Sequence, residues 1–346
     1  MKIKHYFFIC FILENQIPKN SGFYIWRIGI DIAITIVKNN DKKGGWITLV
    51  KLIQCVPNFS EGRDQGILDQ ILNEIRSVEG VKLLDYSMDK DHNRSVVTFI
   101  GDPEGVAEAA FKSTKKASEL IEMSQHKGEH PRMGATDVIP LIPISDVTMD
   151  DCIELSKQLG LKIGNELGIS VFLYEKSASA PHRENLAEVR KGQYEGMNEK
   201  LKHKDWIPDY GPTDLNVKSG VTAIGARMPL VAYNINLGTN DLSIAKKIAK
   251  AIRAKAGGYT YCKALGIEIT ERNIVQVSIN MTDYTKTPLY RVFDTVEREA
   301  RRYGVNIIGS EIIGLVPMNA LIDAADYYLR LEGFDTNQIL ENRMAE

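Results

Sequence analysis

The segment HKGEHPRMGATD, residues 126–137, is dense in side chains that can transfer protons or bind anions. A histidine such as His130 titrates near neutrality and can both accept and donate a proton. Glu129 or Asp137 can orient that ring, and Arg132 can hold a carboxylate through two parallel hydrogen bonds. The composition favours an acid–base site for an anionic small molecule over a purely structural cluster.

A zinc site is the competing interpretation, because His126, Glu129 and His130 spell the H-x-x-E-H pattern of one peptidase class. That chemistry needs both histidines on one face of a continuous helix. Gly128 lies inside the pattern and Pro131 follows it, and the residue before a proline is driven out of helical geometry. We therefore expect no metal at this segment.

Weaker candidates lie elsewhere in the chain. Asn58, in the loop PNFSEG, either belongs to a simple helix-entry turn or reaches a ligand at a strand end. Arg94 closes the loop DHNR, which serves either as a hairpin or as an anion clamp. The segment 220–227, GVTAIGAR, has glycines that would allow a flat ligand to approach, and it ends in Arg227. Cys55 is interpreted as a small, buried hydrophobic residue in preference to a nucleophile.

The composition is that of an ordinary globular protein, with 346 residues, 44% hydrophobic and 25% charged. The formal net charge of -2 leaves no basic excess for binding nucleic acid. The four cysteines are widely spaced and form no CxxC, which indicates free thiols in a reducing cytoplasm. The apolar run at residues 6–13 is too short to span a membrane.

The first 48 residues look unlike the rest. Lys42-Lys43-Gly44-Gly45 requires a coding sequence that can match a bacterial ribosome-binding site, with Leu49 or Val50 as an alternative start. We expect residues 1–48 to be upstream sequence read as protein or a poorly ordered extension. An intact Met1 peptide in mass spectra of the native protein would contradict the first reading.

From Lys51 onward, hydrophobic periodicity predicts two copies of a β-α-β-β-α-β order. The strands expected are 51–56, 81–84, 96–100 and 138–144 in the first copy, and 230–237, 265–269, 275–281 and 305–308 in the second. A helix at 149–167 and a strand at 171–174 extend the first sheet. The helix that opens at Asp102 should end near Gly128, and the polar stretch 176–229 is expected to be a long loop.

The predicted fold is therefore α/β of the α+β kind, with two tandem ferredoxin-like βαββαβ lobes and a ligand cleft between them. The expected domains are an amino-terminal lobe at 49–229, which holds the histidine site, and a carboxyl-terminal lobe at 230–346.

Several blocks in fixed order resemble one family. They are CVPNFSEG (55–62), NR (93–94), GEHPRMGATDVIPLIP (128–143), DYGP (209–212), GARMPLVAYNINL (225–237) and GLVP (314–317). Together they are similar to glutamate formimidoyltransferase, which also forms the amino-terminal half of formimidoyltransferase-cyclodeaminase. The resemblance runs from about Leu52 to the carboxyl-terminal region.

The resemblance implies formimidoyl transfer from N-formimidoyl-L-glutamate to N5 of tetrahydrofolate, the co-substrate, in histidine degradation. It also implies a cytoplasmic homodimer with no membrane or nucleic-acid partner. The family's acid–base histidine precedes Pro-Arg-Met-Gly, which is His130 here. The implied folate-binding segment consists of Gly211, Pro212, Thr213, Asp214, Leu215, Asn216, Val217, Lys218, Ser219 and Gly220.

The chemistry of the substrates adds expectations of its own. The donor and the folate tail carry carboxylates, for which Arg94, Arg132 and Arg227 are candidate partners. A protonated amidine favours a nearby carboxylate, Glu129 or Asp137. Two alternatives stay open: folate-dependent formyl transfer or 5-formyltetrahydrofolate metabolism on the same scaffold, and a folate-binding module without catalysis.

Overall fold

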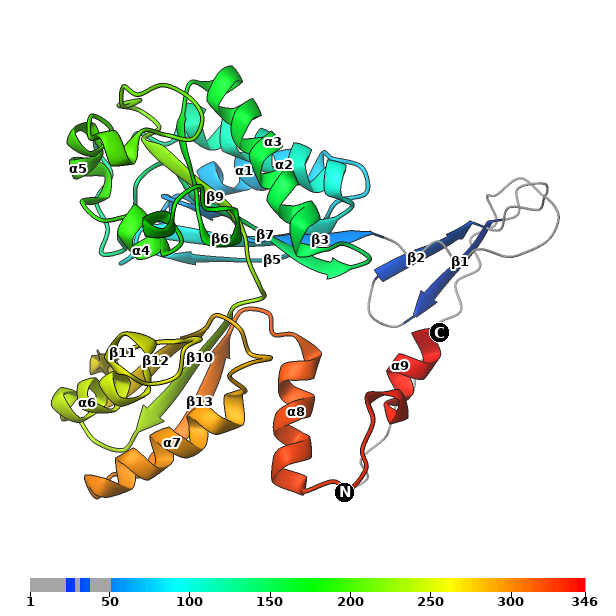
Figure 1. Cartoon of the computed structure of the whole chain (residues 1–346), viewed down its shortest axis with the longest axis vertical. Coiled ribbons are helices and arrows are strands. Elements are labelled where there is room, and N and C mark those ends of the chain that lie inside the picture. The colour runs from blue at the N-terminus through cyan, green and yellow to red at the C-terminus, as the bar shows by residue number, and fades with distance from the viewer. Residues whose placement is uncertain (1–22, 29–31, 38–50, 346) are drawn as a thin grey trace. The chain divides into compact units, whose positions relative to one another are not determined.

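The computed structural model of the chain describes residues 23–28, 32–37 and 51–345 (Figure 1). It separates into one unit of residues 1–50 and 336–346 and a second of residues 51–335. In the first unit, β1 (Phe23–Ile28) pairs antiparallel with β2 (Ile32–Val37), and α9 (Leu340–Ala345) is the last helix. Most of the predicted extension at 1–48 lies outside the described residues, so its origin stays a prediction.

The amino-terminal lobe follows the predicted order of elements. They are β3 (Leu52–Cys55), β4 (Asn58–Phe59), α1 (Gln65–Arg76), β5 (Lys82–Asp89), β6 (Arg94–Gly101), α2 (Pro103–Leu120) and β7 (Thr136–Ser145). β3 and β4 each pair with β6 on one side and with β7 on the other, and β5 pairs with the remaining edge of β6. All these pairings are antiparallel. The α+β fold class is thereby confirmed.

The helices of this lobe form because their apolar residues share one face. In α1, Leu68, Ile71, Leu72 and Ile75 recur at helical spacing and are all fully buried. The side chain of Asp64 begins the helix by accepting hydrogen bonds from two free backbone amides. Both α1 and α2 pack onto the sheet through one continuous core.

The prediction of a long loop at 176–229 is wrong, because this stretch contains an inner strand of the sheet and two helices. The strand β9 (Val221–Ala226) lies between β7 and β8 (Ser170–Leu173), parallel to both, after α3 (Met149–Leu167). All six β9 residues are buried, as expected for an inner parallel strand that packs on both faces. The helices are α4 (Leu186–Val189) and α5 (Gln193–Lys200).

The glycine in β9 serves strand packing. A Cβ atom on Gly225 would lie 2.2 Å from the carbonyl oxygen of Tyr174. The small residue therefore lets the chain after β8 pass close to β9, and the sequence signal that suggested a flat ligand has this structural cause.

The second correction concerns α2, which ends at Leu120 and not near Gly128. Lys218 lies at this point: its Nζ donates to the carbonyl of Glu119 at 2.6 Å, and its own carbonyl accepts from Met123 N at 2.9 Å. The contact with a residue about a hundred positions away replaces helical hydrogen bonds, and residues 121–135 form a loop.

The carboxyl-terminal lobe has the predicted order as well. Its elements are β10 (Val231–Leu237), α6 (Leu242–Ile252), β11 (Cys262–Ile269), β12 (Ile274–Met281), α7 (Leu289–Arg302), β13 (Ile307–Ile313) and α8 (Met318–Leu329). The antiparallel sheet has the order β11-β12-β10-β13. Its core is its own, separate from that of the first lobe. No helix in the described part of the chain is long and apolar enough to cross a membrane.

Replacing Gly225 by alanine should lower the free energy of unfolding by about 1–3 kcal/mol, because the added methyl group overpacks the contact with Tyr174. The matched control is Gly196→Ala in α5, where a Cβ meets nothing within 4 Å. That change should stabilise the protein by about 0.4–1 kcal/mol. Urea unfolding measures both, and equal effects at the two positions would contradict this account of β9.

Candidate active site

His130 lies in the loop between α2 and β7, against the first side chain of β6. Both of its ring nitrogens are 3.2 Å from Nη1 of Arg94. Burial, followed by the positive charges of Arg94 and Arg190, lowers the pKa of His130 to about 2. The ring is therefore neutral near pH 7, and its surroundings oppose protonation until a negative charge is brought to the site.

Asn93 holds the His130 loop in place. Its Oδ1 accepts from the backbone N–H of Gly62 at 3.0 Å, and its Nδ2 donates to the carbonyl of Lys127 at 3.0 Å. The residue is buried and has a left-handed φ of 46°, which asparagine tolerates better than most residues. One side chain thus joins the loop before α1, the β5–β6 hairpin and the site loop.

Gly128 completes this arrangement. A Cβ atom there would lie 2.2 Å from the carbonyl oxygen of His92, so the two backbones can approach only if residue 128 is glycine. The sequence predicts a helix end near Gly128, whereas the structure places this glycine where two loops touch.

His126, which the sequence places in the last turn of a helix that ends near Gly128, lies in a loop and anchors it. Its Nε2 donates to the carbonyl of Asn93 at 2.9 Å, and its Nδ1 accepts from Nε of Arg132 at 3.1 Å. The continuous helix that the zinc pattern requires is not formed, because α2 ends at Leu120. Within residues 51–345, no three metal-ligating side chains gather into a group.

Arg132 is committed to internal contacts. Its side chain is almost fully buried, and its guanidinium donates to both carboxylate oxygens of Glu195, at 2.8 and 2.7 Å, and to the carbonyl of His126. These bonds fasten α5 to the site loop. Its predicted role as a substrate-binding arginine stays a prediction, and its donors are already occupied.

The two predicted carboxylates differ in their surroundings. Asp137 is buried, where one oxygen accepts from the backbone N–H of Met133 at 2.8 Å and the other forms an ion pair with Arg190. Glu129 is exposed and is fixed through its backbone N–H, which donates to the carbonyl of Asp91 at 3.1 Å. Of the two, only Glu129 keeps a carboxylate open to solvent.

Arg190 is the residue that the sequence did not suggest. It ends α4, in the stretch expected to be a loop, and reaches Asp137 from 53 positions away. Its charge and that of Arg94 both act on His130. Among the described residues, the buried Nε–H groups of Arg94 and Arg190 meet no acceptor. No local motif marks such a residue, because only the path of the chain brings it to the site.

The predicted folate-binding segment lies directly beside the site loop. Ala135 N donates to the carbonyl of Ser219 at 2.8 Å, and Val221 N donates to the carbonyl of Met133 at 3.0 Å. Asn216 closes a tight turn by accepting from the backbone N–H groups of Ser219 and Gly220. The exposed residues of the segment 211–220 are Gly211, Thr213, Asp214, Val217 and Lys218.

Asn58 and Arg227 lie at different ends of the sheet. Asn58, in β4, pairs with Val138 at the beginning of β7, and its side chain donates to the carbonyl of Val56 at 3.2 Å. Arg227 follows β9 and donates through its backbone N–H to Leu141, roughly 16 Å along the strand from the start of β7. The backbone of Arg227 therefore lies toward the other end of β7, while its charge and that of Arg190 both act on Tyr174.

Cys55, the alternative nucleophile, is fully buried, and this burial raises the pKa of its thiol. A protonated thiol without solvent access is a poor nucleophile, which favours the packing role.

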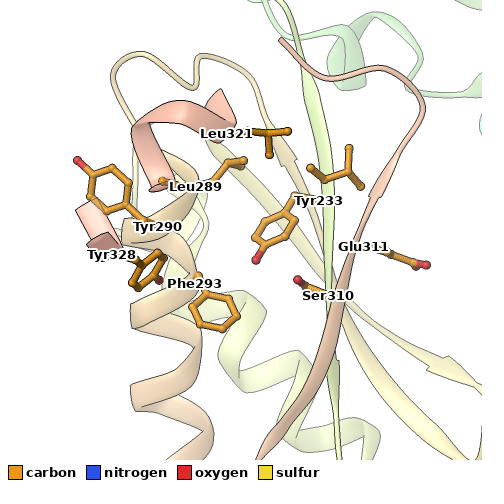
Figure 2. Close-up of a pocket in the computed structure, with 10 residues that line it drawn as sticks. Tyr233, Leu289, Tyr290, Phe293, Ser310, Glu311, Leu321 and Tyr328 are labelled. Carbon is orange, nitrogen blue, oxygen red and sulfur yellow. The ribbon is translucent and has the colours of Figure 1, made fainter. Parts of the chain in front are cut away.

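A hollow of about 460 Å³ lies in the carboxyl-terminal lobe (Figure 2). Tyr290 and Phe293 of α7, Tyr328 of α8 and Tyr233 of β10 are among the residues that line it. Tyr328 also donates to Asp294 at 2.8 Å. The hollow contains none of the predicted site residues, and it marks the place where α7 and α8 cover the sheet incompletely.

Replacing Asn93 by glycine should remove both bridging hydrogen bonds while tolerating the left-handed φ. We expect the free energy of unfolding to fall by about 1–3 kcal/mol, because a buried amide and a buried carbonyl lose their partners. Asn273 is the matched control: it has φ 49° at the equivalent hairpin of the other lobe and is exposed. Asn273→Gly should change stability by less than about 0.5 kcal/mol in the same denaturant experiment. A large loss in both variants would show that the hairpin conformation, and not the bridge, matters.

Comparison with known proteins gives a family. Residues 52–227 match the model "Formiminotransferase domain, N-terminal subdomain", and residues 232–343 match "Formiminotransferase domain". A protein named glutamate formimidoyltransferase from Streptococcus pyogenes serotype M1 is 57% identical, over 86% of this chain and 99% of that protein. One of the same name from Thermoplasma acidophilum is 50% identical, over 85% and 98%.

A formimidoyltransferase-cyclodeaminase from Dictyostelium discoideum is 43% identical, over 85% of this chain and 56% of that longer protein. The resemblance found in the sequence blocks is confirmed, and this chain belongs to the formiminotransferase-domain family.

Proposed function

We propose that the chain is a glutamate formimidoyltransferase. It transfers the formimidoyl group of N-formimidoyl-L-glutamate to N5 of tetrahydrofolate, giving 5-formimidoyltetrahydrofolate and L-glutamate in histidine degradation. The observation that carries the proposal is the position of neutral His130 against Arg94, on a loop paired with the segment 211–220. Such a site can accept a proton and attract an anionic donor at the same point.

The proton balance of the reaction suits a histidine that begins neutral. The lone pair of folate N5 attacks the amidine carbon, and the N5–H proton of the tetrahedral adduct passes to His130. The imidazolium then donates this proton to the departing glutamate nitrogen as the carbon–nitrogen bond breaks. His130 ends neutral, so no net proton is taken up and no covalent enzyme intermediate is needed.

The reacting amidine is cationic when protonated, and a nearby carboxylate would stabilise it. Glu129 is the better candidate, because its neighbour in the site, Asp137, is already paired with Arg190. Glu129→Gln with unchanged turnover would remove Glu129 from this role.

The folate co-substrate binds along residues 211–220 in this proposal, since the exposed turn borders the site loop. Arg227 is not among the charges that act on His130, so its contribution would be to a part of the ligand away from the reacting atoms. The family resemblance adds a homodimer in the cytoplasm, which light scattering on the purified protein can examine for its oligomeric part.

Replacing His130 by alanine should lower turnover by about a hundredfold to ten-thousandfold, because the proton transfer between the two nitrogens is lost. Folate affinity should stay close to that of the wild type, since the ring is not part of the segment 211–220. The assay is formation of 5-formimidoyltetrahydrofolate from both substrates, with equilibrium binding of folate measured in parallel.

Two results would contradict the proposal. A wild-type protein that binds folate and turns over no formimidoyl donor would favour the binding-module alternative. Turnover with a formyl donor in place of the formimidoyl donor would favour the formyl-transfer alternative.

A further inference from the structure

Arg94 forms no ion pair with a carboxylate among the described residues, although Asp137 and Asp89 act on it from a distance. Its guanidinium is largely buried, and among the described residues its hydrogen-bond partner is the neutral ring of His130. Burial, and then the charge of Arg190, lowers the pKa of Arg94, which shows that its surroundings disfavour a cation. A buried cation without a carboxylate partner is costly, and functional sites keep such groups for an anionic ligand.

Arg190 brings a second guanidinium close enough for its charge to act on both Arg94 and His130, and a carboxylate binds this guanidinium. Asp137 binds Nη2 of Arg190 and is itself fixed by the backbone N–H of Met133. Asp137 thus pairs with one of the two cations, whereas Asp89 acts on Arg94 without forming an ion pair with it. Both arginines also keep a buried Nε–H group that meets no acceptor among the described residues.

We propose that Arg94 and Arg190 together bind the α-carboxylate of the glutamate donor and so place its leaving nitrogen at His130. Asp137 is a positioning residue in this arrangement, because it acts by orienting Arg190. The inference rests on the proposed formimidoyl transfer and deepens it by assigning the donor's carboxylate to two named residues.

The chemistry of the substrates favours the donor over the folate tail, which also carries glutamate carboxylates. In N-formimidoyl-L-glutamate, the α-carboxylate and the leaving nitrogen are attached to the same carbon atom. In tetrahydrofolate, a benzoyl ring and an amide separate the tail carboxylates from N5. An arginine in contact with the acid–base histidine is therefore suited to the donor's α-carboxylate.

Carboxylate binding would also change His130. The groups that act on its ring are Arg94, Arg190 and His92, which oppose protonation, and Asp89, which favours it. An anion between the two arginines offsets their charge and raises the proton affinity of the ring. The histidine would then hold the proton of the adduct more readily when the donor is bound than when the site is empty.

The experiment compares wild type with Arg190→Gln and Arg190→Lys. L-glutamate, the expected product, is titrated calorimetrically, and KM is measured for the donor, for tetrahydrofolate and for tetrahydropteroate, which lacks the glutamate tail. Arg190→Gln should weaken glutamate binding and raise the donor KM by about tenfold to a hundredfold, with the folate KM unchanged. Arg190→Lys should recover part of the loss, since it keeps the charge but not the fork.

Arg183→Gln is the matched control. Arg183 is also buried, also paired with an aspartate, Asp209, and comes from the same segment, but it packs against Phe172 and Trp206. It should lose stability without losing glutamate affinity. Histidine-selective NMR supplies a second readout: glutamate should shift the His130 signals toward the protonated form in wild type and in Arg183→Gln, but not in Arg190→Gln.

The outcomes separate the two proposals. Unchanged glutamate affinity and donor KM in a folded Arg190→Gln protein would overturn the carboxylate site. A loss confined to tetrahydrofolate and absent with tetrahydropteroate would reassign the arginines to the folate tail and overturn it as well. Failure of the wild type to transfer the formimidoyl group, with glutamate still bound through Arg190, would reject the reaction and not the binding site.

Discussion

The two hydrogen bonds of the Asn93 side chain are the contact on which the candidate active site depends. They join a backbone amide before α1 to a backbone carbonyl three residues ahead of His130. Because Arg94 follows Asn93 directly, the same anchor sets the position of the guanidinium and that of the ring it meets. The anchor is neutral, buried and satisfied by two backbone partners, so it fixes the loops without placing another charge beside the arginines.

The arginines around His130 differ in whether a carboxylate binds the guanidinium. Arg132 pairs with Glu195 and Arg190 pairs with Asp137, whereas Arg94 contacts the neutral ring of His130 and forms no ion pair among the described residues. The difference lies in what each guanidinium already binds, not in how near it is to the histidine along the chain. Burial, and then the positive charges of Arg94 and Arg190, keep the His130 ring neutral near pH 7.

Local patterns in the sequence were sufficient for most of the fold. Alternation in β12 and helical spacing in α1 predicted elements that the structure contains, since both depend on which face of a short segment is buried. The errors occurred where distant residues intervene. Lys218 ends α2 early, and β9 was read as a ligand-binding loop because its buried, glycine-containing run has no alternation.

The sequence by itself determined the family and the order of the elements, and it supplied the candidate acid–base residue, because the motif blocks and periodicities are local. Only the tertiary structure decided which arginines are free to bind a ligand. Arg132 meets Glu195 across 63 positions and Arg190 meets Asp137 across 53, and no spacing rule connects residues so far apart. The HKGEHPRMGATD segment supplies His130, but its own arginine holds the scaffold, and the second cation of the site arrives from a helix that the sequence did not predict.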